Sequence, residues 1–178
     1  MVKTENIVLG GGCFWCLDAS FSRVKGVIGI TVGYAGGENH DPSYELVCSG
    51  KSGHAEVVRI EFDPAVISLE DVLRIFFSIH DPTTLNRQGG DVGSQYRSVI
   101  LYQNMEQFEI AKKIMDELRS YYDSPMVTDL VSLENFYPAD EYHQKYFKKN
   151  PSQAYCQLVI LPKLAKLKEK YSQYYLRE

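Results

Sequence analysis

The chain has 178 residues, of which 44% are apolar and 24% charged, and this ordinary balance for a globular domain excludes wholesale disorder. Its net charge of −4, with 19 basic against 23 acidic side chains, argues against a general nucleic-acid binder. No apolar run approaches the roughly 20 residues of a membrane helix. We therefore expect a single domain over residues 1–178, cytoplasmic and monomeric by default, with its four cysteines reduced at rest.

Hydrophobic periodicity predicts strands and helices in alternation. Strands are expected at residues 7–9, 27–34, 54–62, 98–102, 131–133 and 157–161. Helices are expected to begin near residue 13 and after residue 68, to cover residues 104–122 and 140–149, and to resume at residue 162. This pattern predicts an α+β fold, a two-layer α/β sandwich in which residues from about 150 to 178 form a C-terminal strand and helix extension. The alternation between residues 28 and 62 indicates that one face of the sheet is open or covered only by loops.

The sharpest local feature is a run of three glycines, residues 10–12, followed by the pair Cys13-x-x-Cys16. The glycines end a strand, and Cys13 is expected at the start of a helix, where free N–H groups and the helix dipole stabilise a thiolate. The pair has two interpretations, a redox site or a metal site. Zinc needs four ligands and often a second such pair, which this chain lacks, so we expect no metal. Phe14 and Trp15, between the two cysteines, either fill core or line a site.

Glu56 is predicted to lie on the apolar face of its strand, because alternation places it with Val58, Ile60 and Phe62. Burial of a carboxyl group disfavours its ionised form, raises its pKa and leaves a proton that can be donated near neutral pH. The alternative interpretations are a buried ion pair with an arginine and a strand end whose face is exposed to water. The long polar loop over residues 80–97 is a second candidate, since Asp91 and Tyr96 within it can supply hydrogen bonds.

Several longer motifs together resemble the A-type peptide-methionine sulfoxide reductases, over most of the chain from about residue 7 to residue 151. The motifs are GCFW at residues 12–15, TVGYAGG at 31–37, YELVCSG at 44–50, GHAEVV at 53–58, GDVGSQYRS at 90–98 and EYHQKY at 141–146. The resemblance implies a mixed sheet with flanking helices, related to the ferredoxin-like arrangement. It also implies reduction of the S epimer of methionine sulfoxide, free or in proteins, without a cofactor.

The same resemblance implies a role for individual residues. Cys13 corresponds to the nucleophile and Glu56 to the proton donor. The groups that bind the sulfoxide oxygen are implied to be Tyr44 and Tyr96, and Asp91 corresponds to the second acid of the site. Phe14 and Trp15 correspond to the rings that hold the methyl group. Attack by the Cys13 thiolate on the sulfoxide sulfur would leave a sulfenic acid, which a second thiol converts to a disulfide. Thioredoxin or another dithiol would then reduce that disulfide.

The resolving thiol is where this sequence departs from the commonest pattern of the family, which has glycine at the position of Cys16 and a cysteine in a flexible glycine-rich tail. Here Cys16 is present, and the tail candidate Cys156 precedes a β-prone run. The C-x-x-C spacing favours Cys16, while Cys156, both cysteines in series, or direct reduction of the sulfenic acid by a small thiol remain open. Two other functions also compete: a cysteine hydrolase with His54 or His143 as base, and a non-catalytic module that binds oxidised methionine.

Overall fold

The structure, a computed structural model, describes residues 3–176. Its strands are β1 (Glu5–Gly10), β2 (Val27–Ala35), β3 (Ala55–Phe62), β4 (Arg87–Gln88), β5 (Asp91–Val92), β6 (Val99–Tyr102), β7 (Asp129–Ser132) and β8 (Phe136–Pro138). Its helices are α1 (Phe14–Phe21), α2 (Tyr44–Cys48), α3 (Leu69–Ser78), α4 (Met105–Leu118), α5 (Tyr146–Lys149) and α6 (Leu161–Lys170). None of the helices described for these residues has the length and apolar character of a membrane span.

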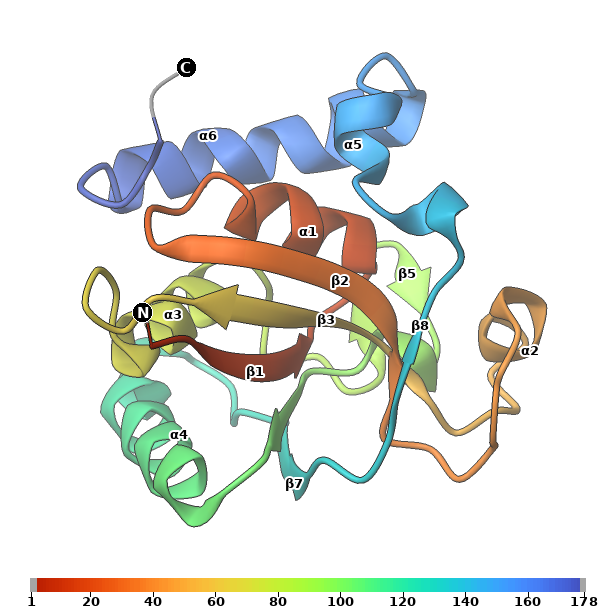
Figure 1. Ribbon diagram of the computed structural model, residues 1–178, viewed down its shortest axis with the longest axis horizontal. Coiled ribbons are helices and arrows are strands. Elements are labelled where there is room, and N and C mark those ends of the chain that lie inside the picture. The colour runs from red at the N-terminus through yellow and green to blue at the C-terminus, as the bar shows by residue number, and fades with distance from the viewer. Residues whose placement is uncertain (1–2, 177–178) are drawn as a thin grey trace.

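Six strands form one curled sheet in the order β7-β6-β1-β3-β2-β8 (Figure 1). The pair β6 and β7 is parallel and the other pairs are antiparallel, so the sheet is mixed. Strands β4 and β5 form a separate small hairpin inside the polar loop over residues 80–97. The prediction of an α+β fold with a mixed sheet is confirmed.

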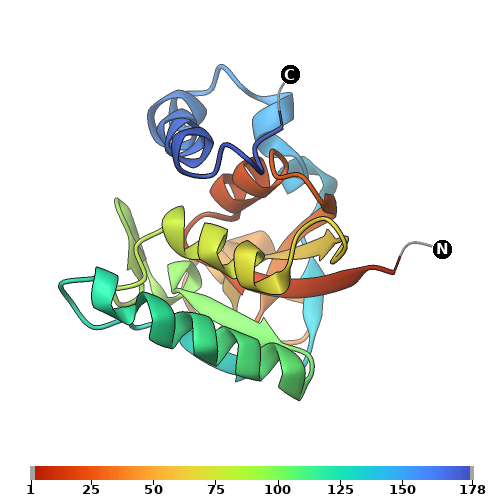
Figure 2. The ribbon, with the colours of Figure 1, turned by 90° about the vertical axis from the view of Figure 1, so that its left-hand side faces the viewer.

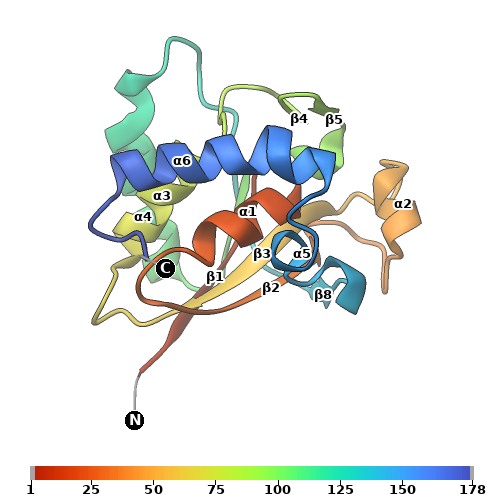
Figure 3. The same cartoon turned by 90° about the horizontal axis from the view of Figure 1, so that it is seen from above.

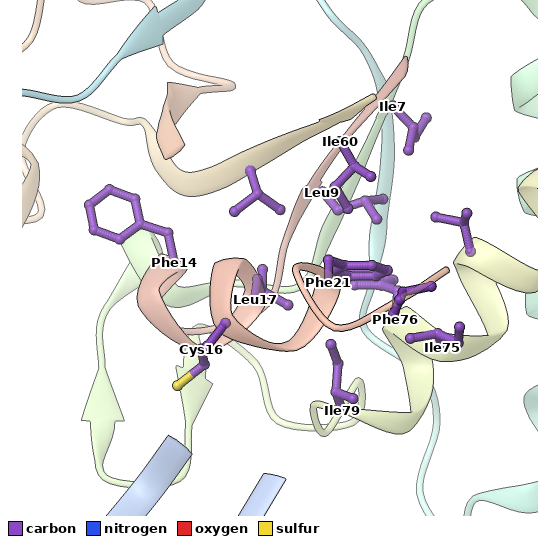
Figure 4. Close-up of a cluster of buried hydrophobic side chains, with 14 of the residues drawn as sticks. Ile7, Leu9, Phe14, Cys16, Leu17, Phe21, Ile60, Ile75, Phe76 and Ile79 are labelled. Carbon is purple, nitrogen blue, oxygen red and sulfur yellow. The ribbon is translucent and has the colours of Figure 1, made fainter. Parts of the chain in front are cut away.

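The two faces of the sheet differ in what covers them. The inner face carries the main core, where Ile7, Leu9 and Ile60 pack against α1, α3 and α4; Figure 4 shows these side chains around Phe21 and Phe76. The outer face holds a small apolar cluster that includes Val8, Val57 and Val99, and Leu133 before β8 and Phe136 within β8 pack against it. As the alternation predicts, no helix is needed on that outer face.

One residue of the predicted alternation is misplaced. Strict alternation along the predicted strand 27–34 would place Ile28 on the same face as Val32 and Tyr34, which are buried, but Ile28 is 55% exposed. The register of β2 against β3 shifts between Val27 and Gly29, and such a bulge turns the extra residue away from the alternating face.

The C-terminal segment lies over α1 on the side away from the sheet, as Figures 2 and 3 show for α6. The predicted strand over residues 157–161 is wrong, because this stretch is a π-helical turn, Cys156–Ile160, that continues into α6. Four buried residues decide its structure: Cys156, Ile160, Leu164 and Leu167 recur at helical spacing and face the core. The helical period therefore prevails over the β-prone composition of the run.

Other boundaries differ in detail. The predicted helix over residues 140–149 is a 3₁₀ turn, Glu141–His143, followed by the short α5, since Lys145 between them has a left-handed backbone. Helix α4 ends at Leu118 and passes into another 3₁₀ turn. Helix α2 and strand β8 have no counterpart in the prediction, because both are too short to show a period.

Gly33 in β2 pairs with β8, and replacing it tests whether the close contact between these two strands requires a residue without a side chain. A Cβ atom there would overlap with the carbonyl oxygen of Tyr137 and lie 2.7 Å from the ring of Phe136. Because overpacking of this kind costs about 1–3 kcal/mol, we expect Gly33→Ala to lower the free energy of unfolding by that amount in urea titrations. The control is Gly29→Ala in the same strand, whose Cβ would meet nothing closer than Glu61 Oε2 at 3.6 Å. Equal effects of the two substitutions would contradict the steric explanation.

Candidate active site

The glycine turn carries the chain from β1 to the start of α1 and leaves Cys13 at the N-cap of that helix. Gly12 has a φ of +92°, and a Cβ there would lie 2.9 Å from Cβ of Gln88. Only glycine fits this position easily, both for its backbone and for its surroundings. The N–H of Gly12 donates to the carbonyl oxygen of Tyr96 at 3.2 Å, which ties the polar loop to the turn. The turn thus brings Tyr96 beside Cys13.

Glu56 lies on the inner face of β3, as alternation predicts, and its side chain is 2% exposed. Its Oε1 accepts the backbone N–H of Phe14, the first residue of α1, at 3.2 Å. Burial outweighs this hydrogen bond and raises the pKa of Glu56 to about 8. The carboxyl group therefore holds its proton at neutral pH, directly beside the residue that follows Cys13. No arginine pairs with it among the described residues.

The thiol of Cys13 is less acidic than its position at a helix start suggests. Burial, a hydrogen bond with Cys16 and the carboxylate charge of Glu56 together raise the pKa of Cys13 well above its ordinary value. Its side chain is only 9% exposed, so the loss of hydration outweighs the helix N-terminus. Burial thus shifts the pKa of Cys13 in the direction opposite to the one expected from its place at the helix start.

Aromatic rings surround the two residues after Cys13. Phe14 is buried, and its ring lies 5.7 Å from that of Tyr34 and 5.4 Å from that of His143, centroid to centroid. Trp15 is half-buried and stacks on Tyr146 at 3.7 Å with an angle of 6° between the rings. The indole N–H of Trp15 donates to Nδ1 of His143 at 3.3 Å. These contacts fix the two rings that were predicted to hold a methyl group.

Hydroxyl and carboxyl groups from three other segments complete the site: Tyr44 on α2, Asp91 on β5 and Tyr96 in the 3₁₀ turn Ser94–Tyr96. Tyr44 begins α2, and its ring lies 4.3 Å from that of His143. Burial raises the pKa of Tyr44, and the charge of Glu56 adds to this effect. Burial likewise raises the pKa of Tyr96, with contributions from the charges of Glu56 and Asp91. Both phenols therefore keep their protons and can donate hydrogen bonds beside Glu56.

Cys16 lies in the first turn of α1 and is 2% exposed. Its sulfur points away from the hydrophobic cluster in Figure 4. It lies 3.4 Å from the hydroxyl oxygen of Tyr155, which in turn donates to Oδ2 of Asp91 at 3.1 Å. Hydrogen bonding with the Cys13 thiol lowers the pKa of Cys16, and the charge of Lys163 supports this. Of the two thiols in the pair, Cys16 is thus the more acidic.

Cys156, the other predicted resolving candidate, is fully buried within the helical C-terminal segment. A mobile cysteine tail was the reason to consider it, and this segment instead packs into the core with Ile160 and Leu164. Burial is the main cause that raises the pKa of Cys156, and the charge of Cys16 raises it further. This electrostatic effect indicates that the two thiols lie near each other.

Two residues of the site were missed as site residues by sequence reasoning. His143 was considered only as a hydrolase base, although it contacts Phe14, Trp15 and Tyr44. Tyr155 was overlooked because it precedes a stretch that was expected to be a strand. An aromatic residue next to a cysteine was the only available signal for it.

The hydrolase interpretation finds no base. His54 uses Nδ1 to accept the N–H of Gly37 at 3.0 Å and Nε2 to donate to the carbonyl oxygen of Asn39 at 2.6 Å. His143 accepts from Trp15, and burial lowers its pKa. Among the described residues no hydrogen bond joins either imidazole to Cys13, although a base in this chemistry must lie within hydrogen-bond reach of its nucleophile.

Comparison with known proteins places this site in a family context. The sequence matches the family described as peptide methionine sulfoxide reductase over residues 5–175. It is 52% identical over 170 residues to the peptide methionine sulfoxide reductase MsrA of Chromobacterium violaceum, covering 94% of this chain and 97% of that protein. The structure is similar to Mxr1 from Saccharomyces cerevisiae in reduced form, with a TM-score of 0.83, 35% identity and coverage of 99% of this chain and 93% of that one. Mxr1 in complex with Trx2 matches with a TM-score of 0.59, 27% identity and coverage of 81% and 85%.

Proposed function

The chain belongs to the peptide methionine sulfoxide reductase family, and we propose that it reduces the S epimer of methionine sulfoxide, free or in proteins, through thiol chemistry at Cys13. The observation that carries this proposal is the hydrogen bond from the N–H of Phe14 to Glu56. It holds a protonated carboxyl group beside the thiol at the start of α1. A nucleophile and a proton donor that converge in this way suit removal of an oxygen atom from sulfur.

In the first half-reaction, Cys13 Sγ attacks the sulfoxide sulfur. Hydrogen bonds from Tyr44, Tyr96 and protonated Glu56 polarise the S–O bond and make that sulfur electrophilic. Glu56 gives its proton to the oxygen, and the S–O bond to the substrate sulfur breaks as the oxygen moves to Sγ of Cys13. The transient bond between the two sulfur atoms also breaks, and the proton that Cys13 released returns to Glu56. Methionine leaves and Cys13 becomes a sulfenic acid, so that the sulfoxide is reduced and the thiol oxidised by two electrons.

Stereoselectivity follows from the opposite characters of the two sides of the site. Phe14 and Trp15 form the apolar side that receives the methyl group, while the phenols and Glu56 form the hydrogen-bonding side. A mirror-image sulfoxide with its methyl group in the same place would direct its oxygen away from the donors. Loss of such hydrogen bonds strongly disfavours the wrong substrate, since the polar groups of the site are then left unpaired.

In the second half-reaction, we assign Cys16 as the resolving thiol. Its direct interaction with Cys13, its position in the same helix turn and its lowered pKa support this assignment. Cys16 attacks the sulfenic sulfur, a disulfide forms and one water leaves. Thioredoxin or another dithiol then restores both thiols by exchange. A related protein, Mxr1, has been crystallised in complex with Trx2.

The function is tested by a single turnover without added reductant. We expect the reduced enzyme to convert about one equivalent of the S epimer of a blocked methionine sulfoxide to methionine, and the R epimer at less than about one hundredth of that rate. Chromatographic separation of the products measures both. Cys13→Ser should form no methionine with either epimer. A protein that only binds oxidised methionine would give no methionine even with Cys13 intact, and equal rates for both epimers would contradict the proposed pocket.

A further inference from the structure

The hydroxyl group of Tyr155 contacts two groups of the site at once. Its oxygen lies 3.4 Å from Sγ of Cys16 and 3.1 Å from Oδ2 of Asp91. Tyr155 comes from the C-terminal segment, 139 residues after Cys16 in the chain, so the folding of this segment over α1 is what creates the contact. The residue immediately precedes the π-helical turn, a type of distortion that is often found at functional sites.

The ring of Tyr155 is held independently of its hydroxyl group. It lies edge-on to Trp15 at 5.9 Å, and Trp15 is itself stacked on Tyr146. The aromatic contacts therefore fix where the hydroxyl oxygen lies. A change of Tyr155 to phenylalanine would leave those contacts in place and remove only the hydrogen-bonding atom.

A single phenolic proton serves two neighbours here. Asp91, when ionised, can only accept, so with Cys16 in its thiol form the Tyr155 O–H points to Asp91 and the Cys16 S–H points to Tyr155. When Cys16 loses its proton, the hydroxyl group can rotate and donate to the thiolate. Burial and the charges of Cys13 and Cys16 raise the pKa of Tyr155, so the phenol retains its proton throughout. Tyr155 can thus hydrogen-bond Cys16 in either protonation state.

Cys16 is surrounded by groups whose charges act in opposite directions. The ionisable residues around it are Cys13 at the N-cap of α1, Glu56 on β3, Asp91 on β5, and Tyr155, Cys156 and Lys163 on the C-terminal segment. Hydrogen bonds with Cys13 and Tyr155 and the charge of Lys163 favour the Cys16 thiolate, while burial and Asp91 oppose it. The hydroxyl group of Tyr155 is the neutral group of this set that lies within hydrogen-bond distance of Cys16 Sγ and is not consumed by the reaction.

We propose that Tyr155 is a catalytic residue of the second half-reaction: its hydroxyl group orients Cys16 and hydrogen-bonds to the thiolate as Cys16 attacks the sulfenic acid of Cys13. The inference rests on the proposed function and on Cys16 as the resolving thiol. In this step an S–S bond forms and the S–O bond of Cys13 breaks. The hydroxyl group of the sulfenic acid leaves as water, together with the proton that Cys16 has released. No external oxidant or reductant therefore takes part.

The experiment follows both half-reactions in one mixing experiment with the full chain. Reduced wild type, Tyr155→Phe and Tyr174→Phe are mixed with the S epimer of a blocked methionine sulfoxide and quenched over time. Methionine reports the first half-reaction, dimedone-trapped Cys13 the sulfenic acid, and loss of free thiols the disulfide. Tyr174→Phe is the matched control, because it removes another tyrosine hydroxyl of the C-terminal segment that also donates to an aspartate, Asp71.

We expect Tyr155→Phe to form methionine in the first turnover but to close the disulfide at least about tenfold more slowly at pH 7, so that sulfenic acid accumulates. The pH profile of disulfide formation should move to higher pH, because the thiolate loses a donor. Tyr174→Phe should resemble wild type in both steps. Disulfide formation by Tyr155→Phe at the wild-type rate and with the wild-type pH profile would overturn the inference, as would an equal slowing of both steps.

Two further readouts separate the possible failures. If wild type forms no methionine, the proposed function fails; if it does so and only the tyrosine effect is missing, the inference alone fails. Should Tyr155→Phe fold poorly, replacement of Tyr155 by 3-fluorotyrosine makes the hydroxyl a stronger donor and keeps its geometry. The pH profile of disulfide formation should then move to lower pH, and an unmoved profile would overturn the inference.

Discussion

A Glu56→Gln variant is expected to lose about 10²–10⁴-fold in the rate of sulfoxide reduction and, at the same time, to become more stable than the wild type. The rate falls because the amide cannot supply the proton that the departing oxygen needs. Substrate binding should persist, since the amide still donates a hydrogen bond. Single-turnover formation of methionine from the S epimer measures the loss, and an unchanged rate would remove Glu56 from the mechanism.

The gain in stability follows from the pKa of the buried carboxyl. Between about 4.5, its ordinary value, and about 8 in the folded protein, Glu56 holds a proton that the unfolded chain releases. Proton release favours unfolding, so the wild type loses stability as the pH rises through this window. Glutamine does not titrate, and its advantage over the wild type should grow by roughly 3 kcal/mol between pH 5 and pH 8.

Urea titrations across this pH range test the claim. Asp18, whose pKa burial raises to about 6, contributes equally to both proteins and cancels in the difference. Glu61→Gln, on the exposed face of the same strand, is the control and should show no such growth. A constant difference between Glu56→Gln and the wild type would mean that the carboxyl is already ionised at neutral pH. Glu56 would then lower the stability of the fold and yet be needed for turnover, which is the trade-off between stability and activity expected at a functional site.

Local patterns predicted where the proposed proton donor and the proposed nucleophile lie. Alternation along β3 placed Glu56 on the inner face with Val58 and Ile60, and each of these side chains is buried there. The glycine turn placed Cys13 at a helix start, which is its N-cap in the structure. Both inferences depend only on residues within a few positions of the site, and such periods are set by backbone geometry.

The electrostatic state of Cys13 and the contacts of Tyr155 could not be obtained in this way. The raised pKa of Cys13 results from burial by elements distant in sequence and from Glu56, 43 residues later, so a helix start alone gave the wrong sign. Tyr155 reaches Cys16 only because the C-terminal segment is helical. Its residues have high β propensity, and Leu158 among them is 77% exposed. The buried residues Cys156 and Ile160 recur at helical spacing and belong to the same core cluster as α1, which the composition alone does not show.

For Cys16→Ser, the expected result is one methionine per enzyme followed by a stall. The first half-reaction does not need Cys16, but the sulfenic acid of Cys13 then has no neighbouring thiol with which to condense. Steady-state turnover with thioredoxin as reductant should fall by at least about 100-fold, and a small thiol in excess should restore part of it. The burst of methionine and the mass of dimedone-labelled peptides measure the two phases.

Cys156→Ala is the matched variant that separates the remaining alternatives. Cys156 is fully buried, and alanine removes its sulfur without introducing a polar group into the core. If Cys16 alone resolves the sulfenic acid, Cys156→Ala turns over with thioredoxin at nearly the wild-type rate, and disulfide mapping of the oxidised wild type finds Cys13 bonded to Cys16. A relay through both cysteines predicts a stall in each variant. A disulfide between Cys13 and Cys156 in Cys16→Ser with full turnover would contradict our assignment, because it would require the packed C-terminal segment to open in every catalytic cycle.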